Sequence, residues 1–208
     1  MDAGRVVFAR DGYDEVGVAD IVEESGVGTR GAFYHHFAGK LDLFREVYAD
    51  VERDLVLRAI ASPPPGSTWD RLRNGLHDVV DAAAAPEIRR ILFEDGRRVL
   101  GWAETRADRR GGSFAMIRDA LVECADSGVI ETDDPVALAH AVIAVVEESA
   151  MMTRSDRSRS TSARRARACL DQLLDAVSTP SGAASTAGPE VIPNPRSRRR
   201  AADKAPRG

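Results

Sequence analysis

VADIVEESGVGTRGAFYHHF, residues 18–37, is the stretch that decides the fold of this chain. Its apolar residues recur with helical spacing on both sides of Gly26, and glycine commonly ends helices. The positions expected to hold the two helices together are Val18, Ile21, Val22, Val27, Phe33 and Phe37. Two short helices joined by a tight turn that contains glycine predict a helix-turn-helix unit.

The outward positions of the second helix carry chemistry suited to the major groove of DNA. These residues are Thr29, Arg30, Gly31, Ala32, Tyr34, His35 and His36. Thr29 and Arg30 stand where free backbone N–H groups and the helix dipole favour phosphate. The Arg30 guanidinium can pair bidentately with a guanine edge or grip a phosphate. Small side chains at Gly31 and Ala32 let the helix backbone approach the groove closely.

The adjacent histidines raise the alternative of a metal site. Neighbouring residues on a helix point in different directions, and no third ligand lies near His35 and His36 in the sequence. The two cysteines, Cys124 and Cys169, are far apart and form no CxxC motif. We therefore expect no metal and no cofactor, and we interpret both cysteines as reduced core thiols.

The remainder of the chain reads as helices without strand alternation, which predicts an all-α fold. The nine expected helices span residues 1–10, 18–25, 29–37, 40–61, 67–85, 86–102, 106–127, 133–153 and 160–177. A break or kink is expected at Asp95-Gly96 inside the sixth. From residue 179 the sequence is rich in Pro, Gly, Ser, Ala and Arg without periodicity, which predicts a disordered tail.

Charge is distributed unevenly along the chain. The net charge is −4, and residues 1–48 hold nine acidic against five basic residues, whereas the tail holds two acidic against six basic. Its RSRRR run, residues 196–200, is interpreted as a solubilising segment or as a nonspecific DNA-binding arm. No uninterrupted apolar stretch approaches the length that spans a bilayer, and Asp2, Arg5 and Arg10 stand where a signal peptide is apolar. We expect a cytoplasmic protein.

A longer stretch, FARDGYDEVGVADIVEESGVGTRGAFYHHFAGKLDLFREV, residues 8–47, resembles the DNA-binding domain of the TetR/AcrR family of transcriptional regulators. It has the Phe-x-x-x-Gly-Tyr end of the first helix and the Tyr-x-x-Phe-x-x-Lys entry into the fourth. PEIRRILFEDGRRVLGW, residues 86–102, also resembles a helix in a branch of that family. The resemblance implies a three-helix DNA-binding domain over residues 1–48, a helical ligand-binding and dimerisation domain over 49–178, and a basic tail over 179–208.

By position, the resemblance also implies the residues that contact DNA. Base or groove contacts fall to Thr29, Arg30, Gly31 and His35, phosphate contacts to Tyr34, His36 and Lys40, and backbone proximity to Gly17 and Val18. Three features depart from the family pattern. Gly17 replaces the usual Ser or Thr, Gly28 adds a residue to the turn, and the first helix lacks the basic arm that normally precedes it. We expect that the natural start lies upstream of Met1.

Candidate ligand contacts in the second half are apolar and aromatic residues with a few polar groups, as small-molecule pockets require. They are Phe93, Trp102, Phe114, Met116, His140, Glu147, Glu148, Met151 and Met152. Plain core packing is the alternative for each apolar one. The helix at 133–153 is apolar almost all round, so at least one of Glu147 and Glu148 must face outward, a dimer partner or a ligand. Because such a helix buries two faces, we expect residues 133–153 and 160–177 to form a dimer interface.

These features together predict a regulator rather than an enzyme. A homodimer would hold two recognition helices about 34–36 Å apart on a palindromic operator. A small molecule would shift the helix at 40–61, the only evident lever between the two domains, and release the DNA. The alternative is a helical small-molecule-binding protein with a degenerate DNA-binding domain. No nucleophile-base set or phosphate loop indicates catalysis.

Overall fold

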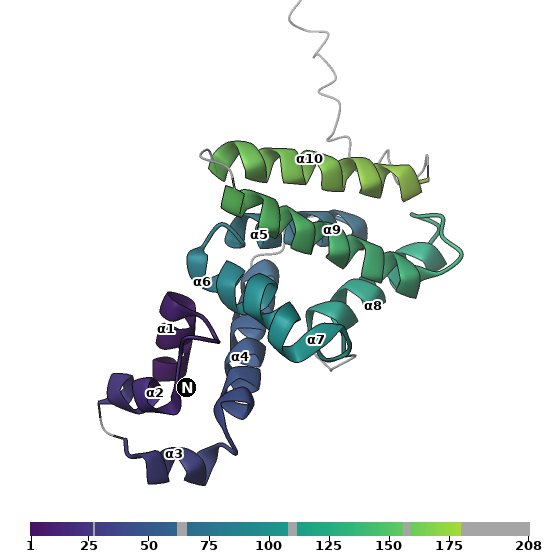
Figure 1. The fold of residues 1–208 in the computed structure, drawn as a ribbon. Helices are drawn as coiled ribbons and strands as arrows, with labels where there is room; N and C mark the ends of the chain where they lie inside the picture. Colours follow the sequence, from purple (N-terminus) through teal and green to yellow (C-terminus); the bar gives the residue numbers. More distant parts are fainter. Residues whose placement is uncertain (27, 62–65, 108–111, 156–158, 180–208) are drawn as a thin grey trace, which may run out of the picture.

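A computed structural model describes residues 1–26, 28–61, 66–107, 112–155 and 159–179 of the chain (Figure 1). The helices are α1 (Asp2–Asp11), α2 (Val18–Ser25), α3 (Arg30–His36), α4 (Lys40–Ala61), α5 (Thr68–Ala82), α6 (Pro86–Ile88), the π-helix η1 (Arg89–Gly96), α7 (Arg97–Thr105), α8 (Ser113–Asp126), α9 (Pro135–Ser155) and α10 (Arg159–Val177). Within these ranges the β pairing is a single isolated bridge between Ile130 and Ser178. The all-α prediction is confirmed.

The long helix α4 joins two helical groups. Helices α1 and α2 lie beside its beginning, and α3 packs on α2, while α5, η1 and α8 pack against α4 further along. Helix α9 lies between α8 and α10, and α10 forms the edge of the molecule opposite α3 (Figure 1). The helix-turn-helix therefore stands at one end of the molecule, away from the helices expected to dimerise.

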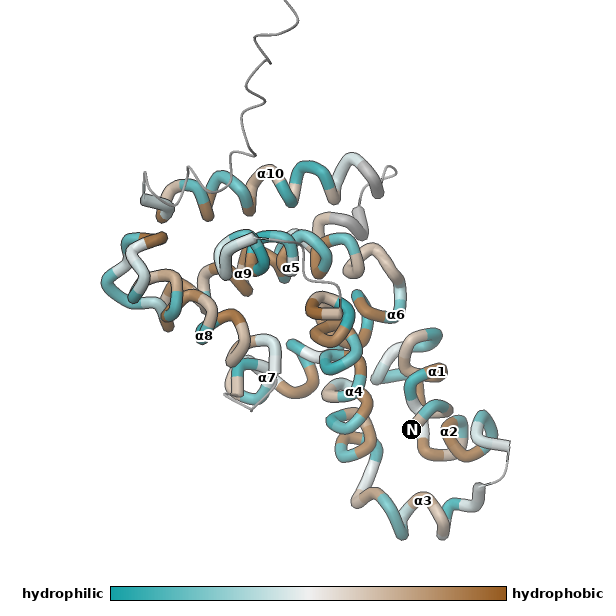
Figure 2. The backbone as a smooth tube through the Cα atoms, turned by 180° about the vertical axis from the view of Figure 1, so that it is seen from behind, coloured by the Kyte–Doolittle hydropathy of each residue, from teal (hydrophilic) through white to brown (hydrophobic). Residues whose placement is uncertain are grey.

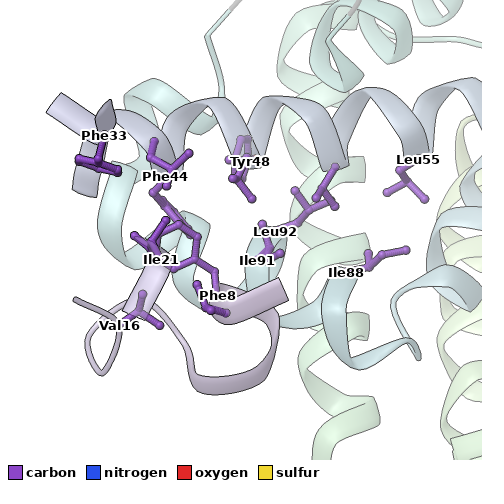
Figure 3. Close-up of a cluster of buried hydrophobic side chains, with 14 residues drawn as sticks. Phe8, Val16, Ile21, Phe33, Phe44, Tyr48, Leu55, Ile88, Ile91 and Leu92 are labelled. Carbon is purple, nitrogen blue, oxygen red and sulfur yellow. The ribbon is translucent and has the colours of Figure 1, made fainter. Parts of the chain in front are cut away.

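The first core is rich in aromatic rings. Phe8 of α1 and Phe44 of α4 are fully buried, and their rings meet edge to face with centroids 5.1 Å apart. The Tyr13 ring meets Phe44 at 5.0 Å. Ile88, Ile91 and Leu92, from α6 and η1, lie in the same cluster (Figure 3). One continuous core thus fixes the DNA-binding half to α4 and to η1.

The second core is mostly aliphatic and binds α5, α8, α9 and α10 together. Its most deeply buried members are Trp69, Val80, Leu121, Cys124, Ala139, Val142, Leu170 and Leu174. Hydrophilic and hydrophobic residues alternate along α10, as in a helix that buries one side (Figure 2). The expectation of buried thiols is confirmed for Cys124 and wrong for Cys169, which is exposed on α10.

The break expected at Asp95-Gly96 is wrong. The chain continues through these residues as η1, and the interruption lies at Gly101, whose φ of 78° and ψ of 169° are not helical. Asp95 is buried and accepts a hydrogen bond from the Tyr13 backbone N–H at 2.8 Å. A Cβ at Gly96 would approach the Tyr48 ring to 2.5 Å, so glycine is required there for close packing rather than for a turn.

Most other predicted boundaries agree with the structure to within a few residues. The exception is the helix expected from residue 106, because α8 begins at Ser113 and Arg106 lies in a turn. Thr29 lies just outside the helix it was expected to begin, because it is the N-cap of α3. Ser67 was expected to cap the fifth helix together with Asp70, and this prediction is confirmed. Val27 and the predicted tail, beyond Thr179, lie outside the described residues.

Helix α9 contradicts the expectation that no segment reaches membrane-spanning length. By length and composition alone, the segment Pro135–Met152 is apolar enough to cross a membrane. The core helix of a soluble protein passes the same test. Helix α9 packs against α5, η1, α8 and α10, and its Glu147 carboxylate pairs with an arginine side chain. This packing buries 33% of the segment and accounts for that part of its apolar composition.

Candidate DNA-binding surface and ligand cavity

The start of α2 is capped without a side chain at the cap position. Gly17 is the N-cap residue, and its backbone N–H donates to the Asp20 carboxylate at 2.7 Å. Gly17 is exposed, whereas Val18 is half-buried against the first core. With Gly17 in place of the usual Ser or Thr, this surface lacks a hydroxyl group. The Asp20 carboxylate still caps the start of α2 through the Gly17 backbone N–H.

The start of α3 is capped by Thr29. The Thr29 Oγ1 atom accepts a hydrogen bond from the Ala32 N–H at 3.1 Å, and Thr29 itself has extended backbone angles. Arg30 is the first helical residue and is exposed. Because a helix start leaves backbone N–H groups without helical partners, this turn presents donors next to the Arg30 guanidinium.

Helix α3 buries one residue and exposes the rest. Phe33 is 7% exposed, and its ring lies 5.5 Å from that of Phe37. Tyr34 is 58% exposed, with its ring 5.2 Å from Phe33 at the edge of the core. The exposed residues from the N-cap to the end of α3 are Thr29, Arg30, Gly31, Ala32, Tyr34, His35 and His36. The described residues contain no group of three or more His, Cys, Asp or Glu side chains that could hold a metal ion.

Lys40 ties the beginning of α4 to the segment between α1 and α2. Its Nζ donates to the Tyr13 carbonyl oxygen at 2.8 Å and lies 4.2 Å from the centre of the Tyr13 ring. Burial raises the pKa of the Tyr13 phenol, with Asp14 adding to the shift. The ring is therefore neutral and forms a cation–π contact with the Lys40 ammonium.

Polar contacts from η1 and α7 also reach the DNA-binding half. Arg90 of η1 donates to the Asp11 carbonyl oxygen at 3.0 Å, and Asp95 binds the Tyr13 backbone. Arg98 lies 2.8 Å from both the Asp95 and the Asp14 carboxylates, and these hydrogen bonds raise its pKa. The π-helix is thus a second connection between the two halves, which the sequence analysis did not identify.

A cavity of about 370 Å³ lies between α4, α5 and α8. Its lining consists of Val56, Ala59, Ile60, Thr68, Arg71, Leu72, Gly75, Leu76, Val79, Ser113, Met116, Ile117 and Ala120. A smaller cavity of about 70 Å³ adjoins it, because Val56, Leu76, Val79, Ser113 and Ile117 line both. We refer to the two neighbouring cavities together as the hollow, which extends from the lining residues of α4 to those of α9.

The inner end of this hollow is polar. Arg106 and Glu147 line it and form a bidentate ion pair, with N–O distances of 2.7 and 2.6 Å. The two side chains are 7% and 13% exposed. On the α4 side, the Glu52 carboxylate accepts a hydrogen bond from the Ser113 hydroxyl at 2.6 Å. The Arg106 Nε atom is buried and has no hydrogen-bond partner in the part of the chain that the structure describes.

Two family descriptions match this chain. Residues 1–47 match the bacterial regulatory proteins of the tetR family, and residues 69–177 match the tetracyclin repressor-like C-terminal domain. The second match alone spans more than half of the chain. The chain belongs to the TetR family. The family resemblance and the fold predicted from the sequence are therefore confirmed.

Individual members of the TetR family match over shorter stretches. The chain is 31% identical to the HTH-type transcriptional regulator AcrR of Shigella flexneri, over 45% of this chain and 44% of that protein. It is 33% identical to an HTH-type transcriptional repressor of Mycobacterium tuberculosis, over 57% of this chain and 62% of the other. The chain spans about half the length of the curated relatives it matches.

Solved TetR-family structures match over more of the chain. A regulator from Pectobacterium atrosepticum superposes with a TM-score of 0.69 and 26% identity, covering 86% of this chain and 91% of the other. A regulator from Rhodococcus superposes with a TM-score of 0.63 at 22% identity, covering 86% and 95%. The second likeness concerns the fold alone.

The structure divides the predicted ligand residues of this TetR-family chain into three groups. Phe93, Met116 and Glu147 line the hollow. Trp102, Phe114 and His140 instead form a separate stack, with the His140 ring 5.3 Å from Trp102 and 4.6 Å from Phe114. The rest lie outside the lining: Glu148 and Met152 are exposed, and Met151 is half-buried.

The expectation for the two glutamates is confirmed, because Glu148 faces outward and Glu147 has Arg106 as its partner. The sequence analysis missed Glu52 and Arg106 as lining residues. For Glu52 a signal existed, since it is a carboxylate one turn after Tyr48 on the buried face of α4. For Arg106 there was none.

Proposed function

We propose that this TetR-family chain is a DNA-binding transcriptional regulator that acts in the cytoplasm as a repressor. As a homodimer it binds a palindromic operator, and a small molecule in the second half releases it. The exposed face of α3 carries the proposal, because Phe33 is buried while Arg30, Tyr34 and His35 are presented to solvent. The activity proposed is binding rather than catalysis.

The proposed contacts follow the arrangement of the exposed groups. In the proposed complex, base edges in the groove are contacted by Thr29, Arg30, Gly31 and His35. Phosphates are contacted by Tyr34, His36 and Lys40, and the DNA backbone passes close to Gly17 and Val18. The exposure of all of these except Val18 and Lys40, which are half-buried, supports this assignment. Lys40 retains two ammonium hydrogens for phosphate, because only one is needed for the Tyr13 carbonyl.

Dimerisation is proposed through α9 and α10. One stripe of α9 is exposed although the helix is apolar, and it consists of Ala137, Ala141, Ala144, Glu148 and Met152. Small side chains let a second helix approach closely. We expect Ala144→Arg to convert the dimer to a monomer in analytical ultracentrifugation. The control is Ala103→Arg, at an exposed residue of α7, and this variant should remain dimeric. A dimer that survives Ala144→Arg would exclude this stripe as its contact.

Release of DNA is proposed to use both connections between the halves. Leu55 and Val56 of α4 line the hollow, and so do Leu92 and Phe93 of η1. Both elements reach Tyr13, α4 through Lys40 and η1 through Asp95. A ligand that displaces either wall therefore changes how the helix-turn-helix is held, and with it the spacing of the two recognition helices.

The test is a gel-shift titration with DNA from upstream of the chain's own gene, at several salt concentrations. We expect specific binding that weakens with salt, because phosphate contacts release counterions. Arg30→Ala should lower affinity about tenfold to a hundredfold, which corresponds to the loss of about 1–3 kcal/mol from one base contact. Arg97→Ala, an exposed arginine on α7, is the matched control and should bind normally. Absence of specific, salt-sensitive binding would favour a small-molecule-binding protein with a degenerate DNA-binding domain.

A further inference from the structure

The two ends of the hollow differ in chemistry, and the difference restricts what it can hold. Its combined size lies within the range of about 300–1,000 Å³ that is typical of small-molecule sites. The larger part has a mostly aliphatic lining from α4, α5 and α8, and no aromatic side chain lines it among the described residues. Its charged residue, Arg71, already donates hydrogen bonds to the Gly66 carbonyl oxygen and the Thr68 hydroxyl. It therefore favours a saturated carbon skeleton over a flat aromatic one, which would gain from ring stacking.

The polar end offers a buried hydrogen-bond donor. Glu147 accepts one hydrogen bond from each terminal nitrogen of Arg106, and the Nε–H of the same guanidinium is buried without a partner among the described residues. A buried donor without a partner is costly, and an acceptor oxygen on a ligand would satisfy it. The head group that fits is thus one with an acceptor oxygen.

Charge at the polar end excludes strongly charged head groups. The carboxylates of Glu52 and Glu147 both line the small cavity and repel an anion. The Arg106 guanidinium lines it as well and repels a cation, and Glu147 is already paired with Arg106. Desolvating a charged head group without a dedicated counter-ion is unfavourable in so buried a site.

We infer that the effector is an uncharged aliphatic molecule with a carbonyl oxygen as acceptor, such as a ketone, ester or lactone. Its carbon skeleton lies between α4, α5 and α8, and its oxygen accepts from the Arg106 Nε–H. This inference rests on the proposed function of residues 49–178 as the ligand-binding domain. It adds the chemical class of the ligand and its orientation in the hollow.

The test compares three probes with equal chains and different heads, namely octanone, octanoate and octylammonium. Dissociation constants are measured by titration calorimetry on the full chain without DNA. We expect octanone to bind about tenfold more tightly than either charged probe, since a charged head must lose its hydration at an end of the hollow that has no dedicated counter-ion for it. Equal or tighter binding of octanoate or octylammonium would overturn the inference, and so would failure of all three to bind.

Two sets of variants locate the probe. A Cβ at Gly75 would meet only the Ala59 Cβ, at 3.9 Å, so Gly75→Ala is the control and Gly75→Met fills the hollow. We expect Gly75→Met to abolish octanone binding and Gly75→Ala to retain it. The double variant Arg106→Met with Glu147→Met removes the donor without leaving a buried charge, and it should weaken octanone binding about tenfold. Unchanged octanone binding in either Gly75→Met or the double variant would contradict the proposed position.

The two proposals can fail separately. Operator binding is measured without any probe, and probe binding without DNA. Normal operator binding with no preference for octanone would overturn the ligand class alone. Preferential binding of octanone without operator binding would support the ligand site and contradict the regulator.

Discussion

The two halves of the molecule place their candidate functional residues differently. They lie on the surface in the first half and in the interior in the second. In the first half, Arg30, Tyr34 and His35 lie on the exposed face of α3, and Phe33 holds that helix to the core. In the second half, Arg106 and Glu147 line a hollow and are themselves buried. Changes to exposed side chains such as Arg30 and His35 should therefore affect function without affecting stability, whereas changes to the hollow should affect both.

The largest expected effect lies in the core that supports α3. Phe44→Ala should lower the free energy of unfolding by about 3–5 kcal/mol, because it empties a fully buried site between Phe8 and Tyr13. Urea denaturation measures it. Leu57→Ala on the same helix, at a side chain that is 52% exposed, is the control and should change stability by less than about 0.5 kcal/mol. A cost below about 1 kcal/mol for Phe44→Ala would show that this core does not hold the DNA-binding half.

The second prediction tests whether function and stability are coupled in the hollow. Arg106→Met leaves the Glu147 carboxylate buried without its partner and should cost about 3 kcal/mol of stability. Adding Glu147→Met should restore most of it, because no charge remains buried. Thermal and urea unfolding of the three proteins measure both changes. If the double variant is as unstable as the single one, the ion pair contributes net stability of its own.

The third prediction compares two helix caps, one in each half. Thr29 caps α3 and Ser67 caps α5 through the same type of hydrogen bond. Thr29→Ala and Ser67→Ala should each cost about 1 kcal/mol of stability. Gel-shift titration should show lower DNA affinity for Thr29→Ala alone, because only α3 presents its first turn to DNA. Equal losses of affinity in both variants would indicate that the caps act through global stability.

The smallest effect concerns the cysteines and leaves stability unchanged. Burial raises the pKa of the Cys124 thiol to about 11, with a further contribution from Glu123, so its reactive thiolate is scarce near neutral pH. Cys169 is exposed on α10. A maleimide added near neutral pH should label Cys169 in the folded Ala144→Arg monomer, and Cys124 only after denaturation, as measured by mass spectrometry. Rapid labelling of native Cys124 would show that the second core opens readily.

Much of the DNA-binding half was predictable because its determinants are local. The inward position of Phe33, the stop at Gly26 and the position of Thr29 at the start of α3 follow from helical spacing and capping within a few residues. The same local rule failed at Asp95-Gly96. In isolation this pair predicts a turn. In the fold, the Asp95 carboxylate accepts a hydrogen bond from the Tyr13 backbone N–H, and the Tyr48 ring packs where a side chain at Gly96 would lie.

The sequence by itself thus determined the helices, their order, the helix-turn-helix and the family, since each depends on spacing along the chain. Only the tertiary structure decided which polar side chains meet. Arg106 and Glu147 are 41 residues apart, and Tyr13 and Asp95 are 82 apart. The hollow likewise exists only because α4, α5 and α8 come together around it. Such contacts depend on how helices pack, and no periodicity within one helix specifies its distant partner.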